Sequence, residues 1–212
     1  MSATVCSPRR LRFEVLAPPK RFSFRGRCKL PGTANVVADY HYPAEWERNL
    51  VLDDDWRVFV RPVRPTDEAL IHDLLKHVTP QDLRLRFFGA MKHFTHEFLD
   101  RLTNLDYARA MAFIAIDKRT SEALGVVRLH LDPSLKSGEY AVLVRSKLKG
   151  RGLGWALMEL IIEFAESKGL EGIHGQILQE NSVMLAMCKE LGFEIRTDPD
   201  DRDLCDVELS FK

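Results

Sequence analysis

Three glycines alternate at the junction between a predicted strand and a predicted helix. The strand spans residues 139–145, and in the helix, residues 153–165, apolar residues recur at i, i+3, i+4, i+7 and i+8. Gly150, Gly152 and Gly154 leave the connecting turn without side chains. The first N–H groups of a helix have no intrahelical partners, and the helix dipole adds partial positive charge there. The junction is therefore predicted to bind a phosphate group.

The spacing of these glycines distinguishes between phosphate-binding motifs. A P-loop requires Lys followed by Ser or Thr after its last glycine, and this segment has no such pair. A dinucleotide fingerprint, Gly-x-Gly-x-x-Gly, fails because its last position falls on Trp155 or Leu157. A third pattern, Arg/Gln-x-x-Gly-x-Gly/Ala, is met by Arg151, Gly154 and Ala156. It resembles the pyrophosphate loop of the GNAT N-acetyltransferases; the alternative is a glycine-rich turn before an ordinary surface helix.

Further stretches carry the same resemblance. Residues 181–193, which end in Leu-Gly-Phe, are similar to the helix that closes the coenzyme site in GNAT enzymes. Other strings look like the bacterial Pat-type protein lysine acetyltransferases: residues 60–67, 84–89, 105–109 and 138–145. The resemblance covers about residues 40–212. It implies an α/β (α+β) GNAT fold, with a mixed central sheet of about six or seven strands, flanking helices, and splayed fourth and fifth strands.

Local patterns outside the glycine junction agree with one compact domain. An acidic turn at residues 53–55 predicts a hairpin, and Thr66 with Asp67 predicts a helix start. Two short helices are expected at residues 80–88 and 95–102. Apolar or alternating runs predict further strands at residues 110–116, 123–131, 172–178 and 206–211.

Composition excludes several functional classes. The 212 residues carry 31 basic and 31 acidic side chains, so no net charge draws the chain to nucleic acid or a membrane surface. No apolar run reaches the length of a membrane span. Four cysteines without a Cys-x-x-Cys pair favour a reducing cytoplasm over a disulfide framework. His93 and His96 have no third ligand nearby, so no metal is expected.

The first 40 residues differ from the rest. Residues 1–30 contain eight Lys or Arg and one Glu, with prolines and no sustained periodicity. We expect a basic, flexible arm over residues 1–40 and the GNAT domain over residues 41–212. A transit peptide and the remnant of a larger upstream domain are alternatives. Pat-type enzymes commonly carry a large acyl-CoA-synthetase-like or cyclic-nucleotide domain there, and neither would fit in this length.

The resemblance implies acetyl-CoA as co-substrate and names its binding residues. Backbone N–H groups of the glycine turn, with the Arg151 charge, would hold the pyrophosphate. The strand edge at residues 142–144 would hydrogen-bond the pantetheine arm, and one of its N–H groups would polarise the thioester carbonyl. Asn181 would hold the arm through its amide, or would be only a helix N-cap. The expected coenzyme-binding residues are Val142, Leu143, Val144, Arg151, Gly152, Leu153, Gly154, Trp155, Ala156 and Asn181.

A base is needed because the lysine ammonium has a pKa of about 10.4, so less than about 1% of it is neutral at pH 7. Glu139 begins the strand that lines the coenzyme and matches the position of the Pat-type catalytic glutamate, where it would act through a water. The alternative for Glu139 is a solvent-facing strand end. Three other glutamates are weaker candidates: Glu122, Glu159 and Glu180.

Two further assignments are open. Many GNAT enzymes protonate the leaving thiolate with a tyrosine five residues before the Phe of Leu-Gly-Phe, and Cys188 takes that place here. Cys188 is either an acid catalyst or a core residue. Phe87, Phe88 and Tyr107 either line the channel for an aliphatic lysine stem or pack in the core.

The predicted function is acetyl-CoA-dependent protein lysine N-acetylation by direct transfer in a ternary complex, with acyl-CoA synthetases as typical Pat-type partners. One alternative is acetylation of a small amine; a polyamine would need carboxylates near residues 84–88, and that segment is basic. Another is a coenzyme-binding sensor of low turnover. The oligomeric state, monomer or dimer, is not decided by the sequence.

Overall fold

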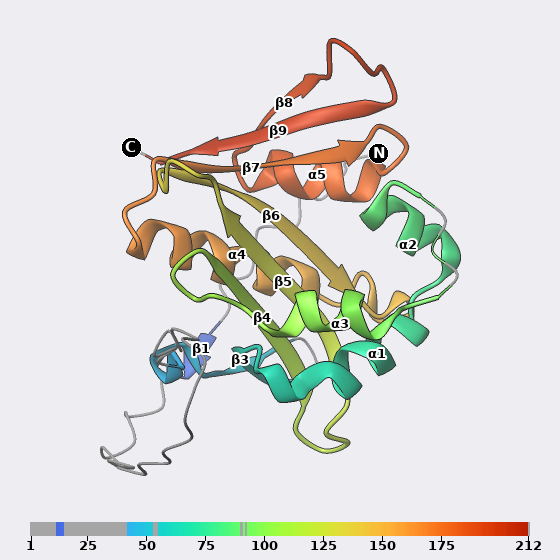
Figure 1. Ribbon diagram of the computed structural model, residues 1–212, viewed down its shortest axis with the longest axis vertical. Helices are drawn as coiled ribbons and strands as arrows, with labels where there is room; N and C mark the ends of the chain where they lie inside the picture. Colours follow the sequence, from blue (N-terminus) through green and yellow to red (C-terminus); the bar gives the residue numbers. More distant parts are fainter. Residues whose placement is uncertain (1–11, 15–41, 53–54, 90, 92, 212) are drawn as a thin grey trace, which may run out of the picture.

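The computed structural model describes residues 12–14, 42–52, 55–89, 91 and 93–211. Within these ranges one sheet has the strand order β1-β2-β3-β4-β5-β6-β7-β9-β8 (Figure 1). Its strands are β1 (Arg12–Glu14), β2 (Arg48–Val51), β3 (Arg57–Pro62), β4 (Ala110–Asp117), β5 (Ala123–Leu131), β6 (Ser137–Val144), β7 (Gly172–Leu178), β8 (Glu194–Thr197) and β9 (Leu204–Ser210). The helices are α1 (Glu68–Lys76), α2 (Pro80–Phe87), α3 (His96–Thr103), α4 (Leu153–Ser167) and α5 (Ser182–Glu190).

The predicted fold class is confirmed, with more strands than expected. Nine strands are described where about six or seven were predicted. Strands as short as β1 and β8 are too short to show an alternating pattern in the sequence. Among the described residues, short 3₁₀ helices at Ala44–Trp46, Pro65–Asp67 and Ser146–Leu148 connect the elements.

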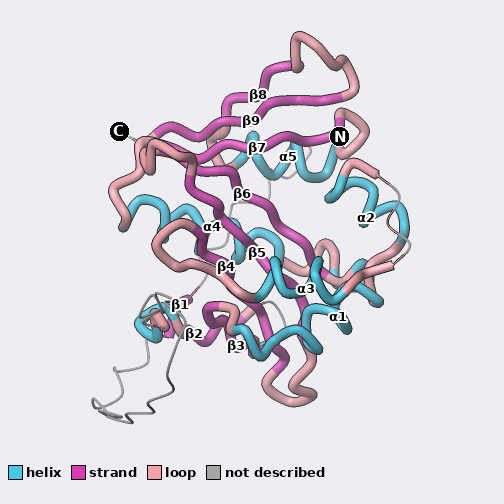
Figure 2. The backbone as a smooth tube through the Cα atoms, in the orientation of Figure 1, coloured by secondary structure: helices cyan, strands magenta, loops and turns pink. Residues whose placement is uncertain are grey.

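Helices cover both faces of the sheet. In Figures 1 and 2, α1 and α3 lie on the near face and α4 lies behind it, with α5 behind β7. Two hydrophobic clusters correspond to these two faces, one built around α4 and the other around α1 and α3. The predicted apolar stripe of α4 is fully buried, as Leu153, Leu157 and Ile161 show. Its burial fixes which side of α4 faces the sheet.

The parallel strands β6 and β7 separate after a short paired stretch. Their pairing covers only Ser137–Glu139 against Gly172–His174. Beyond it, β6 pairs with β5 alone and β7 with β9 alone. The β6 edge from Tyr140 to Val144 is therefore without a strand partner on the β7 side. This is the predicted splay.

A tyrosine ring occupies the point where the two strands part. A Cβ on Gly175 would lie 3.1 Å from the ring of Tyr140, so the missing side chain makes room for that ring. The ring centroids of Tyr140 and Phe193 are 5.2 Å apart. The Tyr140 hydroxyl also lies 3.0 Å from the Cys188 sulfur on α5. These contacts hold α5 against the diverging strands.

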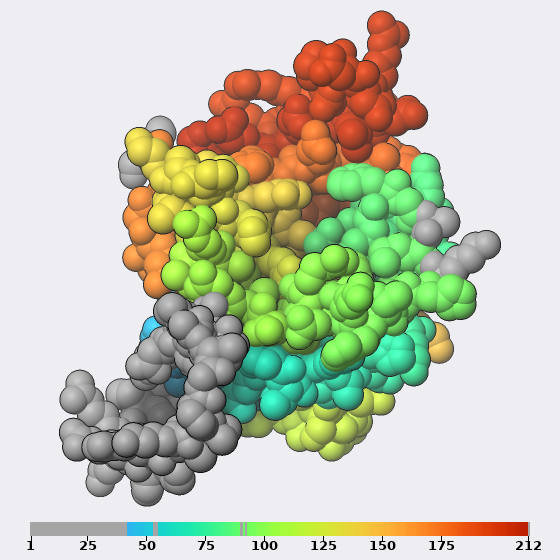
Figure 3. Space-filling model, viewed as in Figure 1, coloured from blue at the N-terminus to red at the C-terminus, as the bar shows by residue number. Residues whose placement is uncertain are grey.

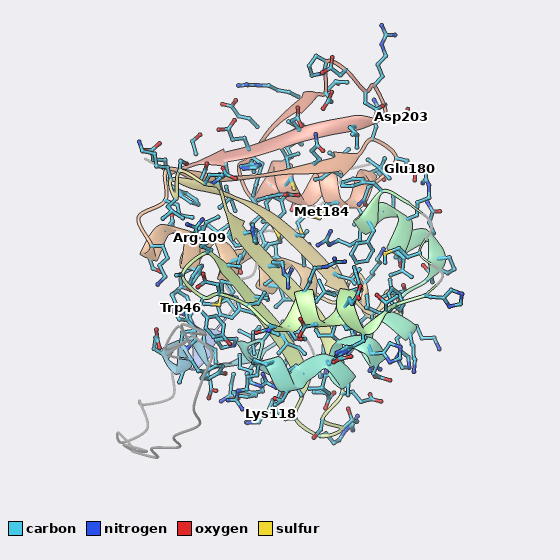
Figure 4. The ribbon with its side chains drawn as sticks, viewed as in Figure 1. Trp46, Arg109, Lys118, Glu180, Met184 and Asp203 are labelled. Carbon is cyan, nitrogen blue, oxygen red and sulfur yellow. The ribbon has the colours of Figure 1, made fainter. Side chains whose placement is uncertain are left out.

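Polar contacts tie α2 across the open side of the splay. Near its start, Asp82 accepts hydrogen bonds from Lys149 and Ser146 of the turn after β6. Burial raises the pKa of Asp82, but these bonds and one from Thr79 outweigh it and lower that pKa overall. Further along α2, Arg84 forms an ion pair with Glu180 at the start of α5. Glu180 is labelled in Figure 4 between α5 and α2.

The N-terminal prediction falls mostly outside the described residues. Within residues 1–40 only Arg12–Glu14 is described, and it pairs as β1 with β2. The boundary between an arm and a domain at residues 40 and 41 stays a prediction. None of the helices in the described ranges combines the length and hydropathy of a transmembrane span.

Candidate active site

A cavity of about 540 Å³ fills the space between the splayed strands. It is bounded by the free edge of β6, the glycine turn before α4, α2, and the inner side of α5. In the space-filling view a recess lies between α2 and the C-terminal strands (Figure 3). Met184, labelled in Figure 4, contributes to the α5 wall. We call this cavity the coenzyme cleft.

The α4 N-terminus at the cleft has free backbone donors. Gly152 is the N-cap, with φ 80°, and it supplies no side-chain cap. The first helical bond runs from the Ala156 N–H to the Gly152 carbonyl at 3.0 Å. The N–H groups of Leu153, Gly154 and Trp155 precede that bond, so they have no intrahelical acceptor. No acidic residue lies in the first turn, and the positive end of the helix dipole is uncompensated there.

Glycine is required at this turn for two different physical reasons. Gly152 has a left-handed backbone that L side chains rarely adopt. Gly154 has an ordinary helical backbone, and a Cβ there would meet no atom within 4 Å. The absence of a side chain at Gly154 therefore serves no packing within the described protein. It leaves open the space into which the N–H groups point, which fits a diphosphate.

The structure places Arg151 differently from the prediction. Its guanidinium lies 4.3 Å from the centroid of the Trp56 ring, and Arg151 is not among the residues that line the cleft. The Trp56 indole N–H in turn donates to Asp117 at 3.2 Å. A cation–π contact explains this orientation. In this structure Arg151 links the glycine turn to the β2–β3 connection and does not reach into the cleft.

This placement gives a stability prediction. Replacing Arg151 with Ala should lower the free energy of unfolding by about 0.5–1 kcal/mol, because an exposed cation–π contact is lost. The coenzyme dissociation constant should rise less than about threefold. Denaturant unfolding and isothermal calorimetry measure the two effects. A tenfold or larger loss of affinity with unchanged stability would restore Arg151 to the pyrophosphate site.

The other predicted coenzyme residues fall into two groups. Val142, Leu143, Val144 and Asn181 line the cleft, as do Gly152, Gly154 and Trp155. Leu153 and Ala156 are fully buried and do not line it, so only their backbones can face that side. The Asn181 side chain accepts from the Met184 N–H at 3.4 Å, which makes it the N-cap of α5. The two interpretations of Asn181 are therefore compatible.

Glu139 is exposed and belongs to the lining of two cavities, the coenzyme cleft and a second groove. The competing glutamates lie elsewhere or are engaged. Glu122 contacts Arg145, Glu180 pairs with Arg84, and Glu159 on α4 does not line the cleft. The geometry thus favours Glu139 among the four candidates. Its catalytic role stays a prediction.

Cys188 is placed in the core and not at the reacting atoms. Its relative exposure is 0%, and it is not among the residues that line the cleft. Burial raises the pKa of the Cys188 thiol, and the hydrogen bond between Cys188 and Tyr140 only partly opposes this. The Tyr140 pKa is raised as well, by burial and by Cys188. Neither group is a stronger acid than an ordinary thiol, so acid catalysis by Cys188 is corrected to core packing.

A substitution separates these roles. Cys188→Ala should change kcat less than about threefold, because no proton transfer is lost. The free energy of unfolding should fall by about 1–3 kcal/mol, since the Tyr140 hydroxyl loses its buried partner. Steady-state kinetics and thermal unfolding are the measurements. A hundredfold loss of kcat in a folded variant would contradict the correction.

The three predicted channel residues separate in the structure. Phe88, at the end of α2, lines the cleft and is 47% exposed. Phe87 instead packs edge-on against Phe98 with ring centroids 5.7 Å apart. The Tyr107 hydroxyl donates to the Val63 carbonyl at 2.5 Å. Phe87 and Tyr107 are therefore packing residues here, which corrects their assignment to the channel.

Sequence comparison places this architecture in a known family. The sequence model of the acetyltransferase (GNAT) family matches residues 73–193, more than half of the chain. The chain belongs to the GNAT acetyltransferase family. It is 30% identical over 152 residues to "Acetyltransferase PA5475" of Pseudomonas aeruginosa, covering 71% of this chain and 82% of that protein. GNAT acetyltransferases use acetyl-CoA, and this GNAT protein is accordingly an N-acetyltransferase.

Two other similarities bear on finer assignments. The crystal structure of the GNAT domain of S. lividans PAT superposes with a TM-score of 0.75 at 23% identity, covering 81% of this chain and 100% of that domain. A shorter match, 37% identical over 57 residues, is to an L-methionine sulfoximine/L-methionine sulfone acetyltransferase of Pseudomonas aeruginosa. It covers 27% of this chain and 33% of that enzyme. The first similarity shows the fold alone.

The coenzyme cleft is also lined by two basic side chains that the sequence analysis did not predict. Lys149 lines it beside the glycine turn and pairs with Asp82. Arg86 lines it on α2, where burial lowers the Arg86 pKa and the charge of Glu139 opposes that shift. Lys149 immediately precedes the first glycine of the turn, so its position was a usable signal. No signal in the sequence indicated Arg86, because Arg86 and Glu139 are far apart in the chain and come together only in the folded protein.

No metal site accompanies these groups in the described ranges. No three His, Cys, Asp or Glu side chains there are grouped so that they could hold a metal ion. His96, which the spacing His93-x-x-His96 singled out, forms a hydrogen bond with Glu68 at 2.8 Å.

Proposed function

We propose that this GNAT protein transfers an acetyl group from acetyl-CoA to the ε-amine of a protein lysine, directly in a ternary complex. The observation that carries the proposal is the position of Glu139. It lies where the coenzyme cleft meets a second groove that opens on the protein surface. A carboxylate with one cavity on each side can contact an amine that arrives from the surface. It can do so while the coenzyme lies along β6.

The residues present fit acetyl-CoA. The free N–H groups at the start of α4 and the open space at Gly154 suit the pyrophosphate, and Lys149 adds charge beside them. The β6 edge from Tyr140 to Val144 has unpaired backbone groups that suit the amides of the pantetheine arm. Acetyl-CoA supplies an activated acetyl thioester. A β6 N–H in this edge would polarise the carbonyl.

Glu139 would remove the proton that blocks reaction. A lysine ammonium with a pKa of about 10.4 is almost entirely protonated at pH 7 and cannot act as a nucleophile. Glu139, directly or through a water, accepts that proton as the amine nitrogen bonds to the acetyl carbon and the carbon–sulfur bond breaks. The proton then passes to solvent. Because Cys188 and Tyr140 are poor acids, the thiolate takes its own proton from solvent.

The acceptor is proposed to be a protein such as an acyl-CoA synthetase. Support comes from the Pat-like strings at residues 60–67 and 138–145 and from the fold shared with the GNAT domain of S. lividans PAT. The groove at Glu139 is open at the surface, so a lysine on a folded protein can approach it.

An amino acid is the second candidate acceptor. Arg86 lies on the α2 wall of the cleft close enough to Glu139 for their charges to interact. A guanidinium in that position suits the carboxylate of an amino acid whose amine faces Glu139. The partial match to an L-methionine sulfoximine/L-methionine sulfone acetyltransferase agrees with this possibility.

One assay separates the candidates. Thiol release from acetyl-CoA is followed with purified acyl-CoA synthetases, with free amino acids, and with other small amines, each alone. Release with the synthetase, and acetyl-lysine found by mass spectrometry, supports the proposal. Release only with amino acids supports the second candidate. Tight coenzyme binding without release in any arm would indicate a sensor and contradict both.

A further inference from the structure

One face of the C-terminal part of the sheet is not covered by a helix in the described ranges. The strands β7 and β9 pack one face on α5 and the main core, where Ile177 and Val207 are buried, and the residues of the neighbouring edge strand β8 are all exposed. Their other face is directed toward the viewer in Figure 1, above α3. We call it the open face.

The strand register places polar side chains in rows on this face. Glu139 pairs with His174, His174 with Glu208, and Glu208 with Glu194. Directly paired residues point to the same side of a sheet, so these four share one face. The next row on that face is Gln176, Asp206 and Arg196. These rows line a groove of about 470 Å³ that ends at Glu139.

The groove carries a net negative charge. Four carboxylates line it, Glu139, Glu194, Asp206 and Glu208, against one arginine and one histidine. Arg196 pairs with Glu194 at 2.6 Å, and His174 contacts the Asp132 carboxylate at 3.1 Å. Glu208 has no side-chain partner among the described residues, so its charge is uncompensated. A cationic partner would find complementary charge along the whole groove.

The opposite side of Glu139 has the opposite charge. There Arg86 lies on α2 and Arg128 on β5, and Arg128 donates to the Arg101 and Leu102 carbonyls at the end of α3. Burial, together with the nearby Arg86 charge, lowers the pKa of Arg128 to about 10. Two partly buried guanidiniums repel a second cation. Charge around the catalytic carboxylate is therefore polarised, negative over the open face and positive toward α2.

We propose that the open face is a docking surface for an extended segment of the acceptor protein that carries a Lys or Arg near its target lysine. This inference rests on the proposed function and specifies its substrate. The target lysine reaches Glu139, and the second cation lies over Glu208. Neighbouring strands are about 4.8 Å apart, so the two carboxylates, two strands apart, are separated by about 10 Å. An extended segment covers that distance in about three residues.

The second cation is thus expected two to four positions from the target lysine, on one side only. On the other side the segment approaches Arg86, where a basic residue is repelled. A lysine flanked by arginines on both sides should be a poorer substrate than one flanked on the favourable side. This asymmetry distinguishes docking in the groove from a general attraction between opposite charges.

The test uses the full chain, acetyl-CoA and synthetic peptides with one lysine. The peptides carry no arginine, one arginine three residues before the lysine, one three residues after it, or both. We expect kcat/KM to be about three- to tenfold higher for one singly substituted peptide than for the neutral peptide. In Glu208→Gln this ratio should fall to near one, and in the wild type it should decrease with added salt. The control Glu166→Gln, exposed on α4 behind the sheet, should keep the ratio.

Two outcomes would overturn the inference and leave the proposed function standing. One is acetylation of all peptides at equal rates, which leaves lysine acetylation standing and removes only the docking surface. The other is an arginine preference that persists in Glu208→Gln. If no peptide reacts while free amino acids are acetylated in the same assay, the proposed function itself fails and the inference with it.

Discussion

Glu139→Gln should lower kcat by about a hundredfold or more while the coenzyme dissociation constant stays within about twofold. The glutamine keeps the size of the side chain and can still hydrogen-bond, but it cannot accept the ammonium proton. The proposed coenzyme contacts lie along β6 and at the start of α4, so they should remain. Because Glu139 is exposed at the meeting of two cavities, its replacement should not disturb packing.

The measurement combines steady-state kinetics with calorimetric titration of acetyl-CoA. Glu190→Gln is the matched control, because Glu190 also lines the cleft and is exposed, at the far end of α5. That variant should retain wild-type kcat within about twofold. In Glu139→Gln the remaining rate should rise with pH, as the fraction of neutral amine increases. Wild-type activity in Glu139→Gln would remove this carboxylate from the mechanism.

Gly154→Val should weaken acetyl-CoA binding by about a hundredfold or more with the fold intact. A Cβ at Gly154 meets no atom within 4 Å, so valine fits the free protein. The same side chain occupies the space in front of the free N–H groups, where the pyrophosphate would lie. Two or more charge-assisted hydrogen bonds would be lost, and each contributes about 1.5–3 kcal/mol.

A graded series controls for general damage. Gly154→Ala should weaken binding less than Gly154→Val, because it adds one carbon and not three. Both variants should unfold within about 1 kcal/mol of the wild type, since alanine and valine are at least as helix-favouring as glycine. Calorimetry and denaturant unfolding give the two quantities. Wild-type affinity in Gly154→Val would show that the diphosphate does not bind at this turn.

Local sequence patterns predicted much of the fold and part of the candidate site. The glycine turn was predictable because helix geometry dictates which N–H groups remain free, whatever surrounds them. The apolar stripe of α4 predicted its burial, and the family pattern predicted the splay of β6 from β7. Glu139 was predicted from the resemblance to the Pat-type enzymes, since its place at the start of a strand alone favours a solvent-facing carboxylate.

The site predictions that were wrong concern side-chain directions, which depend on neighbours distant in sequence. Arg151 turns to Trp56, a residue on the β2–β3 connection, and no local pattern predicts that partner. Tyr107 reaches the Val63 carbonyl, 44 residues away. Cys188 has the spacing of an acid but the surroundings of a core residue, and only the fold shows that Tyr140 fills the adjoining space.

The acidic groove illustrates a different limit. In the sequence, the segment at residues 84–88 is basic and indicates no acidic site for a cationic acceptor. The carboxylates that bear on it come from β6, β8 and β9 instead. Their alignment depends on strand register, and the first and last of them are separated by about 70 residues of sequence.

The position of Glu139, common to two cavities, has a kinetic consequence. In the proposed mechanism acetyl-CoA enters the coenzyme cleft and the acceptor enters the second groove. Neither must then leave before the other arrives, and no acetylated form of the protein is needed in between. Initial rates measured at several concentrations of each should therefore give intersecting double-reciprocal lines, and parallel lines would reveal a shuttle through the protein.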